Sequence, residues 1–170
     1  MKSGYKIPLQ YGLLMGFIAI IGFALQQLVP ETSITAKIIG LSTSALGALT
    51  VYLAVKKHIE SEPSSSFFRL IKTALLTGIF AGIILWAYMA IYYYFLSPGA
   101  MNILIDKRIR VIEQSNQDLT REKINEITGQ FKNYFLYYLF AGTIISQTFI
   151  ALLAGTVTAV LANPNRTGKI

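Results

Sequence analysis

Four long runs of apolar residues, separated by polar segments, dominate the hydrophobic pattern of the chain. The runs cover about 8–29, 34–55, 68–95 and 134–161. Because a helix rises 1.5 Å per residue, about 20 apolar residues are enough to cross the roughly 30 Å hydrocarbon core of a bilayer. The pattern therefore predicts an all-α integral membrane protein, with four transmembrane helices in an up-down bundle that forms a single domain over residues 1–170.

Turn-forming residues mark where these runs begin and end. Pro30 closes the first run, and Ser33 is placed to cap the start of the second. The segment 56–72 contains a proline, four serines and several basic residues, which is typical of a loop that leads into the next helix. Pro98 and Gly99 end the third run. We therefore expect a tight hairpin of the first two spans, followed by a loop that begins where the second run ends.

The segment 99–133 is polar but keeps a helical period. Apolar side chains recur every three or four positions with charged side chains between them, which predicts amphipathic helices. Residues 115–118 interrupt this period, and Thr120 then offers an N-cap for a second helix. The apolar stripe of that helix continues into the fourth run, so the two can form one continuous helix. We expect a pair of amphipathic helices outside the bilayer, between the third and fourth spans.

Composition and charge fit a membrane protein and suggest its orientation. The sequence is 54% hydrophobic and 14% charged, whereas soluble domains are roughly 25% charged. Its net charge of +7 comes from basic residues that flank the spans and meet anionic headgroups, so nucleic acid is not an expected partner. Near the span ends these residues favour the side that holds both termini and 56–72. That side is therefore expected to be cytoplasmic, and the segment 99–133 extracytoplasmic.

Small residues recur at four-residue spacing in all four runs. In lipid, where water does not drive apolar side chains together, such stripes let helix backbones approach closely. We expect the stripes to pack against one another within the bundle. The alternative is that one stripe forms the face of a homo-oligomer. The candidate helix-packing residues are Gly12, Gly16, Gly78, Gly82 and Gly155.

The central part of each span lacks Asp, Glu, His, Lys and Arg. Proton relays and ion-coupled transport sites usually place such groups there, so a proton-coupled pump is not expected. The most polar patch within a span consists of Thr143, Ser146, Gln147 and Thr148. These groups are expected to hydrogen-bond between helices; the alternative is that they line a small pocket.

Residues that support catalysis or metal binding are scarce. The chain has no cysteine, which excludes disulfides and cysteine-based metal sites. It contains no nucleotide-binding loop, catalytic triad or metal-ligand spacing. His58, the only histidine, lies beside Lys56 and Lys57 and is expected to be a surface residue. We therefore predict no enzymatic activity, no catalytic residue, no metal site and no cofactor.

The charged residues of the segment 99–133 have mixed sign. A solvated helix face is the simplest interpretation. A loop of this length with its own helices is often functional, however, so the same residues are candidates for a surface that docks a membrane or periplasmic protein, or lipid headgroups. The candidate docking residues are Asp106, Arg110, Glu113, Arg121, Glu122 and Glu126.

Three stretches of the sequence resemble a known family. They are SSSFFRLIKTALLTGIFAGII at the start of the third span, YYYFLSP at its end, and the polar helical segment before the fourth span. These stretches resemble small bacterial four-helix membrane proteins described only as domain of unknown function 4199, known chiefly from Bacteroidota. The resemblance covers nearly the whole chain. It implies this topology and a multi-pass location in the bacterial inner membrane, and it supplies no catalytic residue.

Two roles remain open from the sequence. The first is a non-enzymatic accessory, assembly or regulatory protein of the membrane that acts through the segment 99–133. The second is a small transporter or channel formed by oligomerisation, in which Thr143 and Gln147 would line a shared path. An enzyme that acts on lipid is less favoured, because the sequence shows no cluster of a nucleophile with an acid–base pair.

Overall fold

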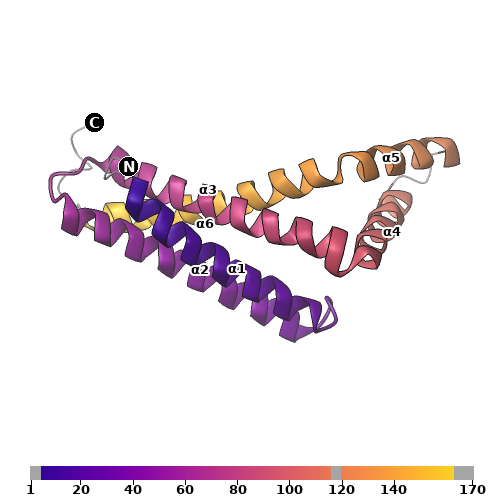
Figure 1. Ribbon diagram of the computed structural model, residues 1–170, viewed down its shortest axis with the longest axis horizontal. Helices are drawn as coiled ribbons and strands as arrows, with labels where there is room; N and C mark the ends of the chain where they lie inside the picture. The colour runs from indigo at the N-terminus through magenta and orange to yellow at the C-terminus, as the bar shows by residue number, and fades with distance from the viewer. Residues whose placement is uncertain (1–4, 116–119, 163–170) are drawn as a thin grey trace. The chain divides into compact units, whose positions relative to one another are not determined.

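Every regular element in the described part of the chain is helical. The computed structural model describes residues 5–115 and 120–162, except for the side chains of Arg108, Glu113, Ser115 and Arg121. The prediction of an all-α fold is confirmed. Figure 1 labels the helices in chain order. They are α1 (Lys6–Gln27), α2 (Ile34–Ser61), α3 (Phe67–Ile91), the π-helical turn η2 (Tyr92–Leu96), α4 (Pro98–Ser115), α5 (Arg121–Asn133) and α6 (Phe135–Ala162).

Within the described residues, four helical segments are long and apolar enough to cross a membrane. They correspond to the four apolar runs of the sequence, and the third of them joins α3 to η2. The prediction of four such helices is therefore confirmed. The segments are Lys6–Gln27, Ile34–Ser61, Phe67–Leu96 and Phe135–Ala162.

The chain divides into two compact units. The first unit comprises residues 1–85 and 142–170, and the second comprises residues 86–141. Both α3 and α6 contribute to each unit, because the divisions fall within these two helices. That the whole chain behaves as a single domain stays a prediction.

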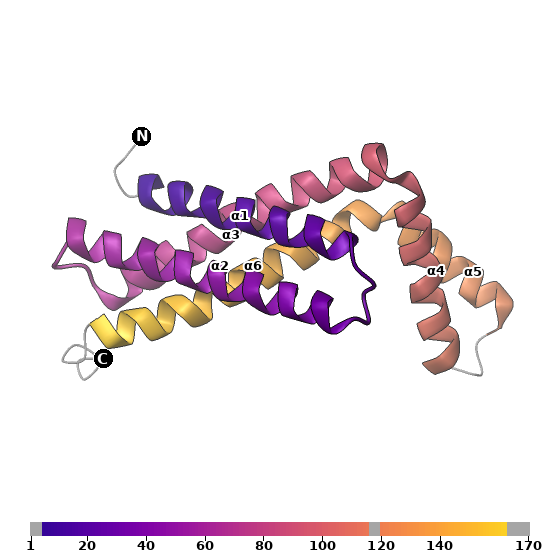
Figure 2. The same ribbon diagram turned by 90° about the horizontal axis from the view of Figure 1, so that it is seen from below.

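The core of the first unit joins all of its helices. In this unit α1, α2, the N-terminal part of α3 and the C-terminal part of α6 lie side by side (Figures 1 and 2). Most of the side chains at its centre are small, which fits helices whose backbones lie close together. The buried cluster consists of Met15, Val51, Val55, Leu70, Ala74, Ala81, Ala151 and Ala159.

Glycines bring α1 against α3. A Cβ atom added at Gly12 would lie 2.6 Å from the Cβ atom of Phe80, and one added at Gly16 would lie 2.9 Å from the Cβ atom of Ile84. Non-bonded carbon atoms have their optimal separation at about 3.5–4.0 Å. The two helices can therefore keep this spacing only if neither glycine position carries a side chain.

Glycines also bring α3 against α6. A Cβ atom added at Gly78 of α3 would lie 2.8 Å from the Cα atom of Thr148 in α6. One added at Gly82 would lie 2.8 Å from the Cα atom of Ile144 in α6. From the other side, a Cβ atom added at Gly155 of α6 would overlap the Cβ atom of Ala74. The predicted packing glycines thus lie at helix contacts within the first unit.

α2 extends further than the apolar pattern indicates. We expected a loop from Lys56 onward, and this expectation is wrong for residues 56–61, which are helical. Lys57 pairs with Glu60 at 3.3 Å, and the hydroxyl of Ser61 donates to the carbonyl of Lys57 at 2.9 Å, so polar contacts continue the helix. The helix ends before Pro63, because a proline disfavours helical geometry in the residue that precedes it.

Two predicted helix starts agree with the structure in part. The side chain of Ser33 accepts a hydrogen bond from the backbone N–H of Ala36 at 3.1 Å, so the predicted cap of α2 is confirmed. Thr120 stands at the N-cap position of α5, but its side chain makes no capping hydrogen bond. Of the interruption expected at 115–118, residues 116–118 lie outside the described part of the chain.

The second unit contains a one-residue break between α5 and α6. The sequence allowed one continuous helix here, but α5 ends at Asn133 and α6 begins at Phe135. Tyr134 between them leaves helical geometry, with φ −105° and ψ 13°. Aromatic packing holds this region, because the ring of Phe135 meets that of Tyr93 edge to face at 5.3 Å and both are buried.

The glycine contacts generate a prediction about residue size. We expect Gly155→Leu to lower the stability of the detergent-solubilised protein by about 1–3 kcal/mol, because the new side chain must displace α3. Thermal unfolding in one detergent measures the effect. Gly142→Leu is the matched control, since no atom lies within 4 Å of a Cβ atom at that position of the same helix. It should leave stability unchanged or raise it by up to about 1 kcal/mol. Equal losses in both variants would contradict the packing role of Gly155.

Candidate functional site

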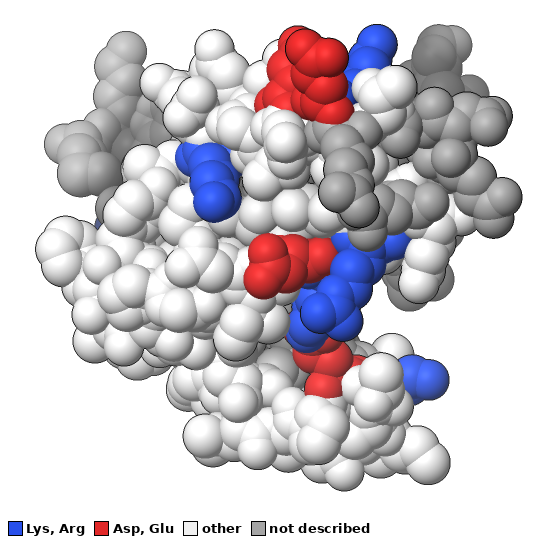
Figure 3. Space-filling view, turned by 90° about the vertical axis from the view of Figure 1, so that its right-hand side faces the viewer, with Lys and Arg blue, Asp and Glu red and all other residues white. Residues whose placement is uncertain are grey.

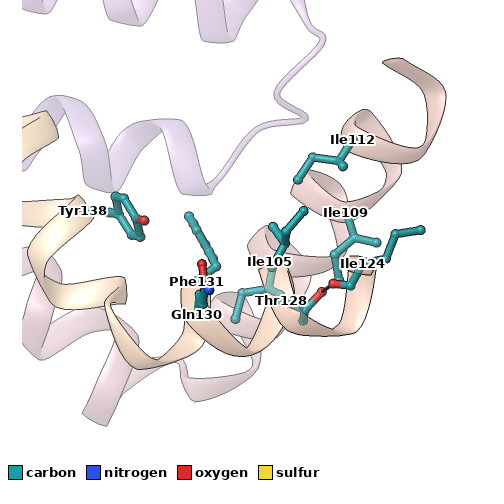
Figure 4. A pocket seen from close by; sticks show the side chains of 9 residues that line it. Ile105, Ile109, Ile112, Ile124, Thr128, Gln130, Phe131 and Tyr138 are labelled. Atoms are coloured by element: carbon teal, nitrogen blue, oxygen red, sulfur yellow. Dashed lines mark hydrogen bonds between the residues drawn. The ribbon is translucent and has the colours of Figure 1, made fainter. Parts of the chain in front are cut away.

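α4 and α5 of the second unit border an open apolar groove with a volume of about 220 Å³. Figure 4 shows side chains of both helices extending into this space. The lining is mostly apolar and includes five isoleucines. We call it the α4–α5 groove, and its lining residues are Ile105, Ile109, Ile112, Ile124, Ile127, Thr128, Gln130, Phe131 and Tyr138.

The spacing of the isoleucines explains how the groove forms. Ile105, Ile109 and Ile112 are separated by four and three residues, which places them on one face of α4. Ile124 and Ile127 are separated by three residues and share a face of α5 in the same way. Two amphipathic helices that face each other with such stripes leave an apolar channel wherever they do not close fully.

The polar groups of the groove have partners within their own helix. The hydroxyl of Thr128 donates to the carbonyl of Ile124 at 2.7 Å. The side-chain amide of Gln130 donates to the carboxylate of Glu126 at 3.3 Å. Since both groups are turned toward α5 itself, the surface that the groove offers to a ligand is largely hydrocarbon.

Aromatic stacking and burial define one end of the groove. Ile105 is buried, and Phe131 stacks on Tyr138 with ring centroids 5.3 Å apart and an angle of 17° between the rings. Phe131 also meets Phe135 edge to face at 6.0 Å. These contacts connect α5 to the start of α6 at this end of the groove, while the isoleucines further along remain only partly covered.

The predicted docking residues whose side chains are described do not line the groove. Asp106, Arg110, Glu122 and Glu126 are exposed, and none of these four is among the lining residues. The side chains of Glu113 and Arg121 lie outside the described residues. Figure 3 shows acidic and basic side chains in small groups, separated by larger uncharged areas.

The groove itself was not among the residues singled out from the sequence. Sequence reasoning used the apolar stripes of α4 and α5 only to predict helices, and it assigned docking to the charged positions between them. The sequence did contain an indication of the groove, namely the isoleucine stripes of two neighbouring amphipathic helices. Such stripes need apolar contacts on all sides, and the two helices supply only part of these contacts to each other.

The structure divides the polar patch of α6 between two surfaces. Thr143 is buried at the contact with α3, where its carbonyl oxygen would lie 3.1 Å from a Cβ atom at Gly82. Thr148 is also turned inward, and its buried hydroxyl oxygen has no hydrogen-bond partner among the described residues. Ser146 is exposed, Gln147 is half-buried, and the Ser146 hydroxyl donates to the Thr143 carbonyl at 3.1 Å.

His58 is only 8% exposed, so the prediction that it is a surface residue is wrong. Nε2 of its ring lies 3.1 Å from the hydroxyl of Ser65, and Nδ1 lies 3.0 Å from the hydroxyl of Thr73. The error follows from the expected loop at residues 56–61. In the helix that exists, His58 falls on the same buried face as Val51 and Val55, at spacings of seven and three residues.

Ser65 links the histidine to a charged pair. Its hydroxyl donates to the carboxylate of Glu62 at 3.4 Å, and that carboxylate also accepts from the guanidinium of Arg69 at 3.3 Å. The hydroxyl of Thr73 lies 3.1 Å from the carbonyl of Arg69. The end of α2, the loop 62–66 and the first turns of α3 are therefore joined by one hydrogen-bonded network. The spacing of residues in the sequence does not predict this network, because its members come from both sides of the loop.

One comparison with known proteins identifies the family of the chain. The sequence profile of a family described as "Protein of unknown function (DUF4199)" matches residues 10–163. Comparison with curated proteins and with solved structures found no match. The family resemblance noted from the start and end of the third span is thereby confirmed. Since the match covers nearly the whole sequence, the chain belongs to the DUF4199 family of proteins of unknown function.

Proposed function

We propose that this chain is a non-enzymatic, multi-pass protein of the bacterial inner membrane that binds an amphipathic helix of a membrane or periplasmic partner in the α4–α5 groove. The groove is the observation that carries the proposal. Such a protein would act in assembly or regulation, by holding its partner at the membrane.

The outward faces of the long helices support insertion in a bilayer. Phe17 of α1, Leu41 of α2, Ile83 of α3 and Phe149 of α6 are between 40% and 74% exposed. In water, each Å² of such apolar surface costs about 25 cal/mol, and helices that are apolar on all sides are buried or span membranes. Lipid would cover these faces.

Basic residues support the proposed orientation. Lys56, Lys57, Arg69 and Lys72 lie at the end of α2 and the start of α3, close to the loop 62–66. By the positive-inside rule this loop faces the cytoplasm, together with both termini. The α4–α5 groove then faces the periplasm.

The size and shape of the groove favour a helix over a small molecule. Sites that enclose a drug-sized ligand usually measure about 300–1,000 Å³, whereas this groove measures about 220 Å³ and is open. Such a space suits one or two apolar anchors of a helix, at positions three or four residues apart. Exposed charges of both signs, at Asp106, Arg110 and Glu122, would orient the partner along the groove.

An oligomeric transporter or channel is the second candidate, and one observation favours it. Ser146 is exposed and Gln147 is half-buried on α6, and polar side chains in lipid favour a polar neighbour on another helix. In an oligomer, Ser146 and Gln147 would supply the exposed and half-buried polar groups of a shared path. Ion or solute flux in liposomes, with Gln147→Leu as the variant, distinguishes this role from partner binding.

The proposed orientation predicts a pattern of chemical labelling. The chain has no cysteine, so single cysteines introduce the sole reactive thiols. We expect Asn102→Cys on α4 to react with a membrane-impermeant maleimide in intact spheroplasts, and Ser64→Cys to react only after lysis. Both positions are exposed, unlike the buried Ser65 beside the second one. The reverse pattern would overturn the orientation, and labelling of both before lysis would overturn insertion.

Partner binding predicts a difference between two isoleucines of α4. Ile109 lines the groove, whereas Ile103 is exposed on the same helix and does not line it. We expect gentle purification from the native host to recover a stoichiometric partner with the wild type and with Ile103→Ser. With Ile109→Ser, recovery should fall at least about tenfold, since a buried apolar anchor contributes roughly 1.5–3 kcal/mol.

Native mass determination and thermal unfolding of each variant complete this test. If Ile109→Ser folds as the wild type does and retains the partner, the groove is not the binding site. A wild type that carries no partner protein, and is a homo-oligomer instead, would contradict partner binding and favour the transport role.

A further inference from the structure

A second pocket lies in the first unit, between the start of α1, the end of α2 and the first turns of α3. Its volume is about 200 Å³, and its walls include Tyr5, His58, Glu62, Arg69 and Lys72. Six of its seven lining residues carry a polar or charged group, whereas isoleucines predominate in the α4–α5 groove. We call it the α2–α3 pocket.

The described charges of the α2–α3 pocket do not cancel. Arg69 and Lys72 are cationic, and Glu62 is the carboxylate in the lining. Glu62 is already engaged, because it accepts hydrogen bonds from Arg69 at 3.3 Å and from Ser65 at 3.4 Å. Lys72 makes no ion pair among the described residues, and its ammonium group lies 5.9 Å from the centre of the Tyr5 ring. The pocket therefore keeps a net positive charge even when His58 is neutral.

The buried network around His58 anchors the part of α3 that carries these cations. His58, Ser65 and Thr73 are 8%, 3% and 3% exposed, and their hydrogen bonds connect α2, the loop 62–66 and α3. Arg69 and Lys72 are three residues apart on α3, so they project on the same side of this anchored helix. A ligand would thus meet two exposed cations on one side of an anchored helix, and the guanidinium of Arg69 is already oriented by its bond to Glu62.

The hydroxyl of Thr73 lets the network accept either charge state of the imidazole. It can donate to Nδ1 of a neutral His58, or donate to the carbonyl of Arg69 and accept from Nδ1–H of a protonated His58. Neither state leaves a ring nitrogen without a partner, since Nε2 faces Ser65 in both. A positive charge on His58, in addition to those of Arg69 and Lys72, is therefore compatible with the same fold.

We propose that the α2–α3 pocket binds the phosphate group of an anionic lipid at the cytoplasmic surface of the membrane. A guanidinium with free N–H groups and an ammonium are the usual partners of phosphate oxygens. One net positive charge matches the single negative charge of a phosphodiester headgroup. Leu76, one turn further along α3 from Lys72, adds an apolar wall on which the glycerol backbone and the start of an acyl chain would lie.

This inference rests on the membrane insertion and orientation of the proposed function, but not on the α4–α5 groove. Free phosphate is the other source of the same chemistry. It carries no apolar part, so it would gain nothing from Leu76.

Native mass spectrometry of the full chain, purified in detergent and mixed with phosphatidylglycerol or phosphatidylcholine, tests the proposal. We expect one phosphatidylglycerol molecule to be retained in preference to phosphatidylcholine. Lys72→Gln should weaken this binding about fivefold, because one cation near the headgroup contributes about 1 kcal/mol. Arg69→Gln should weaken it as well. Lys57→Gln is the matched control, since Lys57 is equally basic, lies on the adjacent helix end and is paired with Glu60 outside the pocket.

The remaining outcomes separate the alternatives. Equal binding of both lipids, or equal losses in Lys72→Gln and Lys57→Gln, would overturn the site. Displacement of phosphatidylglycerol by millimolar inorganic phosphate, which itself binds the wild type but not Lys72→Gln, would assign the pocket to free phosphate instead. Flotation of the same samples with phosphatidylcholine vesicles reports membrane insertion independently, so failure of the lipid site is distinguishable from failure of the proposed function.

Discussion

The first unit depends on close contact between α3 and its two neighbours at positions that carry no side chain. Gly12 and Gly16 of α1 allow close contact with α3, and Gly78 and Gly82 of α3 allow close contact with α6. In a lipid environment no hydrophobic force draws apolar helices together, so association relies on dispersion contacts, which need short distances. The alanine-rich core follows from the same requirement, because larger side chains would hold the helices apart.

Several buried hydroxyl groups in these helices are satisfied locally and add little to the contacts between helices. Thr50 donates to the carbonyl of Leu46, Thr77 to that of Thr73, and Thr158 to that of Ala154, all at 2.7–2.8 Å. Each pair is four residues apart, so the bond stays within one helix. The buried threonines can therefore pack as small apolar groups. Polar contact between α2 and α3 is instead concentrated around His58, at the end of the bundle where the loop 62–66 emerges.

The helices could be predicted from sequence, whereas the polar network around His58 and the break between α5 and α6 could not. An apolar period that extends over more than twenty residues determines a helix whatever its neighbours are, which is why the four long segments were found. The end of α2 was misjudged because Lys56–Ser61 is polar yet helical, and this misplaced His58. No proline or glycine marks the break at Tyr134, and the rings of Phe131 and Phe135 meet across it. The four-residue spacing of glycines suggested close helices, but which helix meets which glycine is a property of the fold.

The glycine contacts also say what kind of information specifies this bundle. Leucine, isoleucine and phenylalanine on the outward faces are interchangeable as far as hydropathy is concerned, and a chain of the same hydropathy with its glycines moved would have the same apolar runs. What distinguishes the two chains is volume, at a few positions where even one methyl group is excluded. Helix neighbours in this protein are thus encoded by missing atoms rather than by chemical character. Relatives that differ at nearly every apolar residue can keep the fold, provided that the glycines at the helix contacts are retained.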